Sequence, residues 1–137
     1  MNWTLEVVCV PVTDVDRAKQ FYAEQLGFVV DIDDTVGGKR AVQLTPPGSG
    51  CSIAIGTALT KMKPGSLQDV QFVVRNLKAA RQTLVENGVE VSNLQIYQRD
   101  GTYRPATEED ALDYWGFIHF QDPDGNGWAV QQISDRP

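Results

Sequence analysis

The sequence has few of the residues and segments on which several classes of protein depend. Its 137 residues include one histidine and two cysteines, Cys9 and Cys51, each in an apolar stretch. Such cysteines are typical of buried free thiols in a cytosolic protein, where disulfides are rare. No apolar run is long enough to cross a membrane, and the first residues, MNWTLEVV, lack the basic and apolar regions of a signal peptide. We therefore expect a soluble, cytoplasmic protein.

Basic residues are also few and scattered. The chain has 12 Lys and Arg against 18 Asp and Glu, for a net charge of −6, and no basic cluster. This balance argues against a nucleic-acid partner and against an anionic membrane surface. It mildly favours a cationic ligand, although an acidic surface equally serves solubility.

The most informative feature that is present is an internal repeat. Residues 45–50 (TPPGSG) and 122–127 (DPDGNG) are Pro-Gly turns that each precede a short apolar run, and the segments upstream of them, 8–30 and 70–91, are also alike. A repeat of this length indicates duplication of a supersecondary module, so we expect a ligand site between two related halves.

The chain length and its 42% hydrophobic residues suit a single domain spanning 1–137. We place the first module at about residues 1–60 and the second at about 66–135.

The apolar pattern predicts the order β-α-β-β-β in each half. Thr13-Asp14 and Asn76 are the expected N-terminal caps of the two helices, and Gly27 is the expected residue after the end of the first. Strands are expected at 4–12, 28–32, 41–45 and 51–55, and again at 69–74, 89–97, 115–121 and 128–133. Asp33–Gly38 is expected to be a turn. The polar stretch 98–113 interrupts the second half, either as a lid or as a solvated edge.

Two βαβββ modules with LGF after the first helix and DPDGN before the last strand resemble the vicinal oxygen chelate superfamily. This is the group of glyoxalase I, the bleomycin-resistance proteins and the extradiol dioxygenases. PVTDVDRAKQFYAEQLGF is similar to its first module and FQDPDGNGWAVQQ to its closing hairpin. The resemblance implies an α+β fold in which two modules form an incomplete barrel-like sheet with helices packed outside. It also implies a homodimer.

Metal enzymes of this family hold their ion on the inward faces of the first and last strand of each module. Distances from the family motifs place these positions at Val7, Ser52, Asp69 and Ala129. A register shift of two gives Cys9, Ala54, Gln71 and Gln131. Neither set supplies the several carboxylate or imidazole ligands that a divalent ion needs. We therefore expect no metal, no other cofactor and no metal-dependent glyoxalase or dioxygenase activity.

Strand alternation predicts that these positions share one face of each sheet and that the opposite, apolar face packs under the helices. The first face mixes small apolar groups with amides, as pockets for organic ligands do. The predicted ligand-binding residues are Val7, Cys9, Gln43, Ser52, Asp69, Gln71, Tyr103, Trp115 and Gln131. Asp69 and His119 are candidates for acid–base catalysis. The repeat aligns Gln43 with Phe120, which leaves the direction of His119 open.

Three hypotheses for function follow. The first is a metal-free protein that binds an organic ligand, aromatic or cationic, in the manner of the drug-sequestering members of the superfamily. The second is a lyase or isomerase that uses Asp69, His119 or Cys9 without a metal. The third is an accessory module whose cleft is filled by its own side chains. The sequence favours a binding protein over an enzyme.

Overall fold

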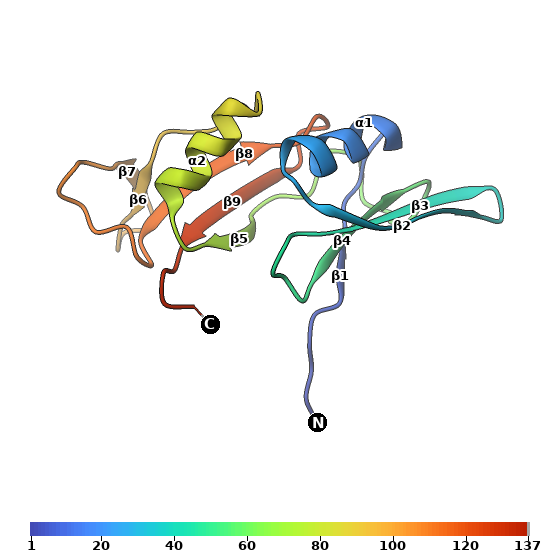
Figure 1. Cartoon of the computed structure of the whole chain (residues 1–137), viewed down its shortest axis with the longest axis horizontal. Helices are drawn as coiled ribbons and strands as arrows, with labels where there is room; N and C mark the ends of the chain where they lie inside the picture. The colour runs from blue at the N-terminus through green and yellow to red at the C-terminus, as the bar shows by residue number, and fades with distance from the viewer. Residues whose placement is uncertain (137) are drawn as a thin grey trace. The chain divides into compact units, whose positions relative to one another are not determined.

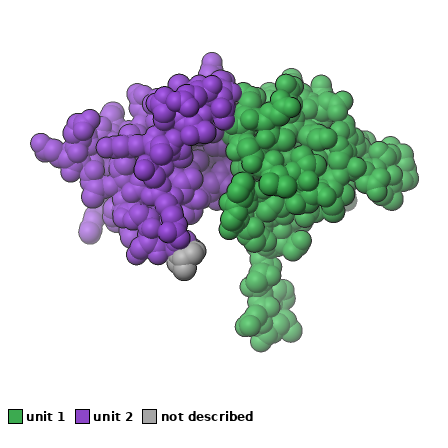
Figure 2. Space-filling model, in the orientation of Figure 1, with its two compact units in different colours: residues 1–67, 122–126 green, residues 68–121, 127–137 purple. Residues whose placement is uncertain are grey.

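The computed structural model describes residues 1–136 and contains two helices and nine strands in two sheets (Figure 1). The chain divides into two compact units, which Figure 2 distinguishes by colour. Unit 1 consists of Met1–Leu67 and Asp122–Asn126, and unit 2 consists of Gln68–Gln121 and the residues from Gly127 onward. No helix in the described part of the chain is long and apolar enough to cross a membrane.

Unit 1 contains the first βαβββ module. Its elements are β1 (Val7–Cys9), α1 (Val15–Gln20), the π-helical segment η1 (Phe21–Gln25), β2 (Val29–Val36), β3 (Lys39–Thr45) and β4 (Ser52–Gly56). The sheet order is β1-β4-β3-β2, and only β1 and β4 are parallel. As predicted, Asp14 caps the helix by accepting a hydrogen bond from the Arg17 backbone N–H at 3.1 Å. Gly27 follows the helix with a φ of 78°, as expected of a residue that ends a helix.

One face of the unit 1 sheet packs beneath α1 and η1. The side chains buried there come from alternate positions of the strands and from the inner side of the helix: Val10, Val42, Leu44, Ile53, Ile55, Ala18, Phe21 and Tyr22. This confirms the predicted apolar face. The opposite face has no helix of unit 1 on it.

The β2–β3 hairpin is longer than predicted. Asp33–Val36 were expected to form a turn, but β2 continues through them, and the turn is Gly37-Gly38 with φ values of 59° and 77°. Arg40 explains the difference, because its guanidinium binds Asp33 through both carboxylate oxygens at 3.0 and 2.9 Å. The hydrogen bonds from Arg40 and Lys19 hold the pKa of Asp33 well below its usual range.

Unit 2 contains the second module with one additional strand. Its elements are β5 (Val70–Val74), α2 (Leu77–Glu86), β6 (Gln95–Tyr97), β7 (Tyr103–Pro105), β8 (Gly116–Gln121) and β9 (Gly127–Gln132), in the sheet order β5-β9-β8-β6-β7. Asn76 caps α2 by accepting from the Ala79 backbone N–H at 3.0 Å. Helix α2 packs on β8 and β9, over buried Ile118, Trp128 and Val130.

The stretch 89–105 differs from the prediction of one long strand followed by a polar loop. Of the predicted strand 89–97, only Gln95–Tyr97 forms a strand of the sheet, and Val91 makes a single bridge to Phe120. Tyr103–Pro105, expected within the loop, pairs with β6 as the edge strand β7. Arg104 anchors it through a two-pronged contact with Asp110 at 2.8 and 2.7 Å.

Two helices with two open sheets of four and five strands confirm the predicted α+β class and its two βαβββ modules. Neither sheet closes into a barrel by itself.

The DPDGN turn between β8 and β9 is held by hydrogen bonds within unit 1. Asp122 is buried, and its carboxylate accepts from the Tyr22 hydroxyl at 2.7 Å and from the backbone N–H groups of Asp124 and Asn126 at 2.9 Å. The Asn126 side chain donates to the Pro11 carbonyl at 2.8 Å and accepts from the Leu67 N–H at 3.1 Å. The acidic and amide residues of this turn are therefore structural.

Tyr22→Phe should destabilise the protein, because it removes a hydrogen bond to a buried carboxylate. The expected loss is about 1–3 kcal/mol of the free energy of unfolding, measured by urea denaturation. Tyr114→Phe is the matched control, since the Tyr114 hydroxyl also binds an aspartate, Asp135, at 2.7 Å but at the surface. It should leave the urea midpoint nearly unchanged. Equal losses in the two variants would contradict the structural role assigned to Asp122.

Candidate functional site

In unit 2, the sheet face opposite α2 carries most of the predicted site residues. Cross-strand partners point to the same side of a sheet. One row across the strands is Gln71, Ala129 and His119, and the next is Val73, Gln131, Phe117 and Gln95. Tyr97 and Tyr103 continue this face onto β6 and β7. The face therefore joins amides with aromatic rings, and His119 lies on it.

An aromatic cluster occupies the β6–β8 side of this face. The Tyr103 ring centroid lies 4.8 Å from that of His119, 5.2 Å from Tyr97 and 5.6 Å from Phe117, in tilted or edge-to-face geometries. Such distances are those of stabilising aromatic pairs. Phe117 is buried beneath the others, while Tyr97 and Tyr103 remain 37% and 40% exposed. The cluster thus presents an organised aromatic surface that the chain itself only half covers.

His119 is held in one orientation and is favoured in its neutral form. Its Nδ1 lies 2.9 Å from Gln95 Oε1, an acceptor, which assigns the ring proton to Nδ1 and leaves Nε2 as an acceptor. Burial lowers the pKa of His119 below 6.5, and the negative charge of Asp69 partly offsets that effect. A neutral imidazole on this face can stack on a ligand and accept a hydrogen bond.

Asp69 acts on this cluster through its charge. It precedes β5 with a φ of 65°, a left-handed conformation that Asp tolerates better than most residues. Its charge opposes the lowering of the His119 pKa. Burial raises the pKa of Tyr103, and the nearby Tyr97 and Asp69 add to the rise. The Tyr103 hydroxyl therefore stays protonated at neutral pH.

The remaining predicted residues of unit 2 lie at the borders of the aromatic cluster. Gln71 donates to Gln131 at 3.4 Å, and Gln131 donates to the Tyr114 carbonyl at 2.7 Å, which orients its amide. Trp115 lies just before β8, where its carbonyl accepts from the Tyr97 N–H at 2.9 Å. Its side chain is 45% exposed.

In unit 1, the predicted residues also share the face without a helix. Val7 lies opposite Ser52, and Ala54 lies between Cys9 and Gln43 in the next row. Ser52 is buried and its hydroxyl lies 2.6 Å from that of Thr45. The side chains at these positions are smaller than those on the helix-free face of unit 2, and none of them is aromatic.

The donor set does not fit the metal that the fold family implies. In unit 1 the paired positions are Val7 and Ser52, and in unit 2 the residue opposite Ala129 is Gln71 rather than Asp69. Gln71 lies five positions before its helix cap (76 − 71), whereas Val7 lies seven before Asp14 (14 − 7), so the fixed distance of seven placed this position at Asp69. Valine and alanine have no donor, and serine and glutamine are poor ligands for a catalytic ion. Within residues 1–136, no group of three His, Cys, Asp or Glu side chains is placed to hold a metal.

The direction of His119, left open by the repeat, follows from hairpin length. Thr45 continues the β3–β4 register opposite Ser52, whereas His119 lies opposite Ala129. Ser52 follows Thr45 by seven positions and Ala129 follows His119 by ten (52 − 45 and 129 − 119), so His119 corresponds to Thr45, and Phe117 rather than Phe120 corresponds to Gln43. Gln95, Tyr97 and Phe117 were missed in the sequence. The alternation of β8 contained a signal for Phe117, but β7 gave none that would bring Tyr97 and Tyr103 together.

A protein of the glyoxalase-like class is defined by two such modules, by caps and turns that repeat between them, and by sheet faces without helices. The chain belongs to the Glyoxalase/Bleomycin resistance protein/Dioxygenase superfamily, whose sequence model matches residues 4–130.

Several relatives cover almost the whole chain. TnmS3, an antibiotic binding protein from Streptomyces sp. CB03234, is 27% identical with a TM-score of 0.75, over 97% of this chain and 98% of TnmS3. A glyoxalase/bleomycin resistance protein from the same strain is 28% identical with a TM-score of 0.73, over 94% and 100%. The uncharacterized protein YetH of Bacillus subtilis (strain 168) is 24% identical over 127 residues, which are 91% of this chain and 94% of YetH.

His119 should titrate with a midpoint below 6.5, because burial disfavours the imidazolium. As the only histidine it gives one Hε1 signal, whose shift against pH measures the midpoint directly by proton NMR. Asp69→Asn should lower the midpoint further, since it removes the charge that favours the cation. A midpoint at or above 6.5 would contradict the burial of the ring.

The same shift has a consequence for stability. As the pH falls, the unfolded state takes up a proton at His119 at a higher pH than the folded state does. The stability that depends on neutral His119 is therefore fully present above about pH 6.5. It is lost as the pH falls through 6.5 toward the folded pKa. The free energy of unfolding of His119→Gln, measured with urea, should fall less than that of wild type as the pH is lowered through this window.

Proposed function

We propose that this protein binds a small organic molecule with a planar aromatic part, and that the helix-free face of the unit 2 sheet supplies the stacking surface. The half-exposed cluster of Tyr97, Tyr103 and His119 over buried Phe117 is the observation that carries the proposal. The rings are already packed edge to face, so a ligand can bind without a large ordering cost. Gln71, Gln131 and Trp115 border the surface and offer hydrogen bonds and further apolar area.

Two further points support binding over catalysis. Acid–base chemistry requires a proton donor and acceptor in reach of one substrate. Here His119 Nδ1 is engaged by Gln95, and Asp69 affects the ring through its charge. The similarity to TnmS3, described as an antibiotic binding protein, extends over nearly the whole of both chains at 27% identity. We infer by this similarity that the ligand is a drug-like organic compound.

A matched pair of neutral probes tests the stacking surface. 2-Naphthol should stabilise the protein in a thermal-shift experiment and should displace the His119 Hε1 signal in NMR spectra. Decahydro-2-naphthol has the same ring skeleton and hydroxyl group without the aromatic system, and should do neither at the same concentration. Equal binding of the two compounds would contradict a stacking site.

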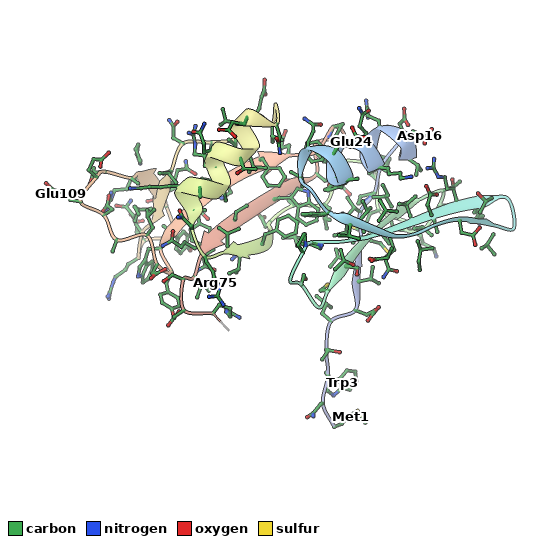
Figure 3. All side chains as sticks on the ribbon, viewed as in Figure 1. Met1, Trp3, Asp16, Glu24, Arg75 and Glu109 are labelled. Carbon is green, nitrogen blue, oxygen red and sulfur yellow. The ribbon has the colours of Figure 1, made fainter. Side chains whose placement is uncertain are left out.

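Tyr103→Ala should weaken 2-naphthol binding about fivefold, because an aromatic pair contributes on the order of 1 kcal/mol beyond its buried area. Trp3→Ala is the control, since Trp3 is 85% exposed on the N-terminal segment that leaves the unit 1 sheet (Figure 3). It should leave binding unchanged. If both variants lose affinity equally, the probe binds exposed aromatic residues without selectivity.

Binding is also proposed to need no metal. Protein purified without chelators should contain far less than one divalent ion per chain by elemental analysis. Exhaustive dialysis against EDTA should leave both the thermal midpoint and 2-naphthol binding unchanged. A stoichiometric ion, together with loss of binding on its removal, would overturn this part of the proposal.

A further inference from the structure

Strand β2 contains a bulge at Asp31, whose side chain lies on the helix-free face of the unit 1 sheet. The β2–β3 register runs from Val30 opposite Leu44 directly to Ile32 opposite Gln43, so Asp31 has no partner on β3. The bulge changes the facing of the residues that follow it: Ile32 shares the helix-free face with Asp31, and Asp33, opposite buried Val42, lies on the face beneath the helices. On the helix-free face the Asp31 carboxylate accepts a hydrogen bond from the Thr45 hydroxyl.

The hydrogen bonds at this point have a defined direction. The Thr45 hydroxyl donates its only hydrogen to Asp31 Oδ2, because a carboxylate can only accept. The Ser52 hydroxyl, 2.6 Å from that of Thr45, must then be the donor of their contact. The order is Ser52 to Thr45 to Asp31. Ser52, which is buried, keeps its acceptor lone pairs, and the carboxylate keeps its second oxygen.

The exposed Asp31 carboxylate and the half-buried Thr45 hydroxyl thus offer acceptors to a group that lies on this face, and buried Ser52 supports them. An approaching group must supply hydrogens, and a positive charge would gain most from the carboxylate. A protonated amine has both properties.

The charge of Asp31 is not matched within the described chain. Asp33, two residues further on the same strand, is bound by Arg40 at 2.9 Å and by Lys19 at 2.7 Å. No ion pair of Asp31 occurs among residues 1–136, and the two basic side chains that bind Asp33 lie on the opposite face of the sheet. Asp31 is therefore an exposed carboxylate that is held in place by two neutral hydroxyl groups, those of Thr45 and Ser52.

The geometry points to a second binding site: Asp31, Thr45 and Ser52 form a subsite on unit 1 that takes a protonated amine of a small-molecule ligand. Asp31 is the counter-ion, and Thr45 and Ser52 fix its orientation and add an acceptor. The inference rests on unit 1 alone. It goes beyond the aromatic site proposed for unit 2 and does not depend on it.

Benzylamine and benzyl alcohol are suitable probes, since they differ in the charged donor and share the ring. In amide NMR spectra at pH 7 and low salt, benzylamine should shift the signals of Asp31, Thr45 and Ser52, and should bind at least fivefold more tightly than benzyl alcohol. Added salt should weaken the amine and leave the alcohol unchanged. Equal affinities, or shifts that fall elsewhere, would overturn the assignment.

Asp31→Asn should weaken benzylamine about fivefold or more, because it removes the charge and keeps the shape. Asp34→Asn is the matched control: the same substitution on the same strand, at an exposed residue whose carboxylate accepts from the Thr35 backbone N–H at 2.8 Å. It should leave benzylamine binding within twofold of wild type. Equal losses would show a general effect of charge and would contradict a defined subsite.

Thr45→Val removes the hydroxyl that links Ser52 to Asp31 without changing the charge, and should weaken benzylamine binding two- to threefold. The amide spectra confirm folding of each variant, and Asp31 is exposed, so its substitution leaves the core intact. Binding of 2-naphthol should be unaffected by Asp31→Asn. This separates the two proposals, since a failure of the aromatic site would appear with Tyr103→Ala and a failure of the amine subsite with Asp31→Asn.

Discussion

The hydrogen bonds of the Asp122 carboxylate are the constraint on which the geometry of the second module depends. They set the path of a five-residue turn together with two backbone bonds, from the Gly125 N–H to the Asp122 carbonyl at 3.0 Å and from the Asp122 N–H to the Asn126 carbonyl at 2.9 Å. Because the turn length is fixed, Gln121 must lie opposite Gly127, and His119 opposite Ala129. A slip of one residue would send every side chain of one strand to the other face of the sheet. The turn therefore decides that His119 lies with the tyrosines and not beneath α2.

The same logic applies to unit 1, where an irregularity in the pairing has the comparable effect. Asp31 lies on the helix-free face by ordinary alternation, and the bulge places Ile32 on the same face, so that Asp33 turns to the face beneath the helices. The bulge thus separates the Asp33 carboxylate, which Arg40 and Lys19 bind, from the Asp31 carboxylate, which accepts from Thr45. In both units the chemistry of the face thus depends on where the strand pairing departs from the simple repeat.

This dependence explains which features the sequence could predict. The two faces of each sheet follow from period-two alternation, and the helix starts at Asp14 and Asn76 follow from capping residues, so both were predictable. The longer hairpin, the bulge at Asp31 and the edge strand Tyr103–Pro105 depend on particular side-chain contacts between segments, such as Arg40 with Asp33, Thr45 with Asp31 and Arg104 with Asp110. No local pattern reports such contacts. For that reason the repeat alone mispaired Gln43 with Phe120 and placed Asp69 where Gln71 lies.

Duplication explains how one scaffold supports two unlike faces. The caps and the main strand pairings occur in both halves, whereas the residues at the helix-free positions differ between them. Where unit 1 has Val7, Thr45 and Ser52, unit 2 has Gln71, His119 and Ala129. A shared metal would have constrained both sets to carboxylates or imidazoles, since an ion needs several such ligands at once. Without such a ligand set, the two faces differ in chemistry: the unit 1 face carries hydroxyl groups and the Asp31 carboxylate, and the unit 2 face carries amides and aromatic rings.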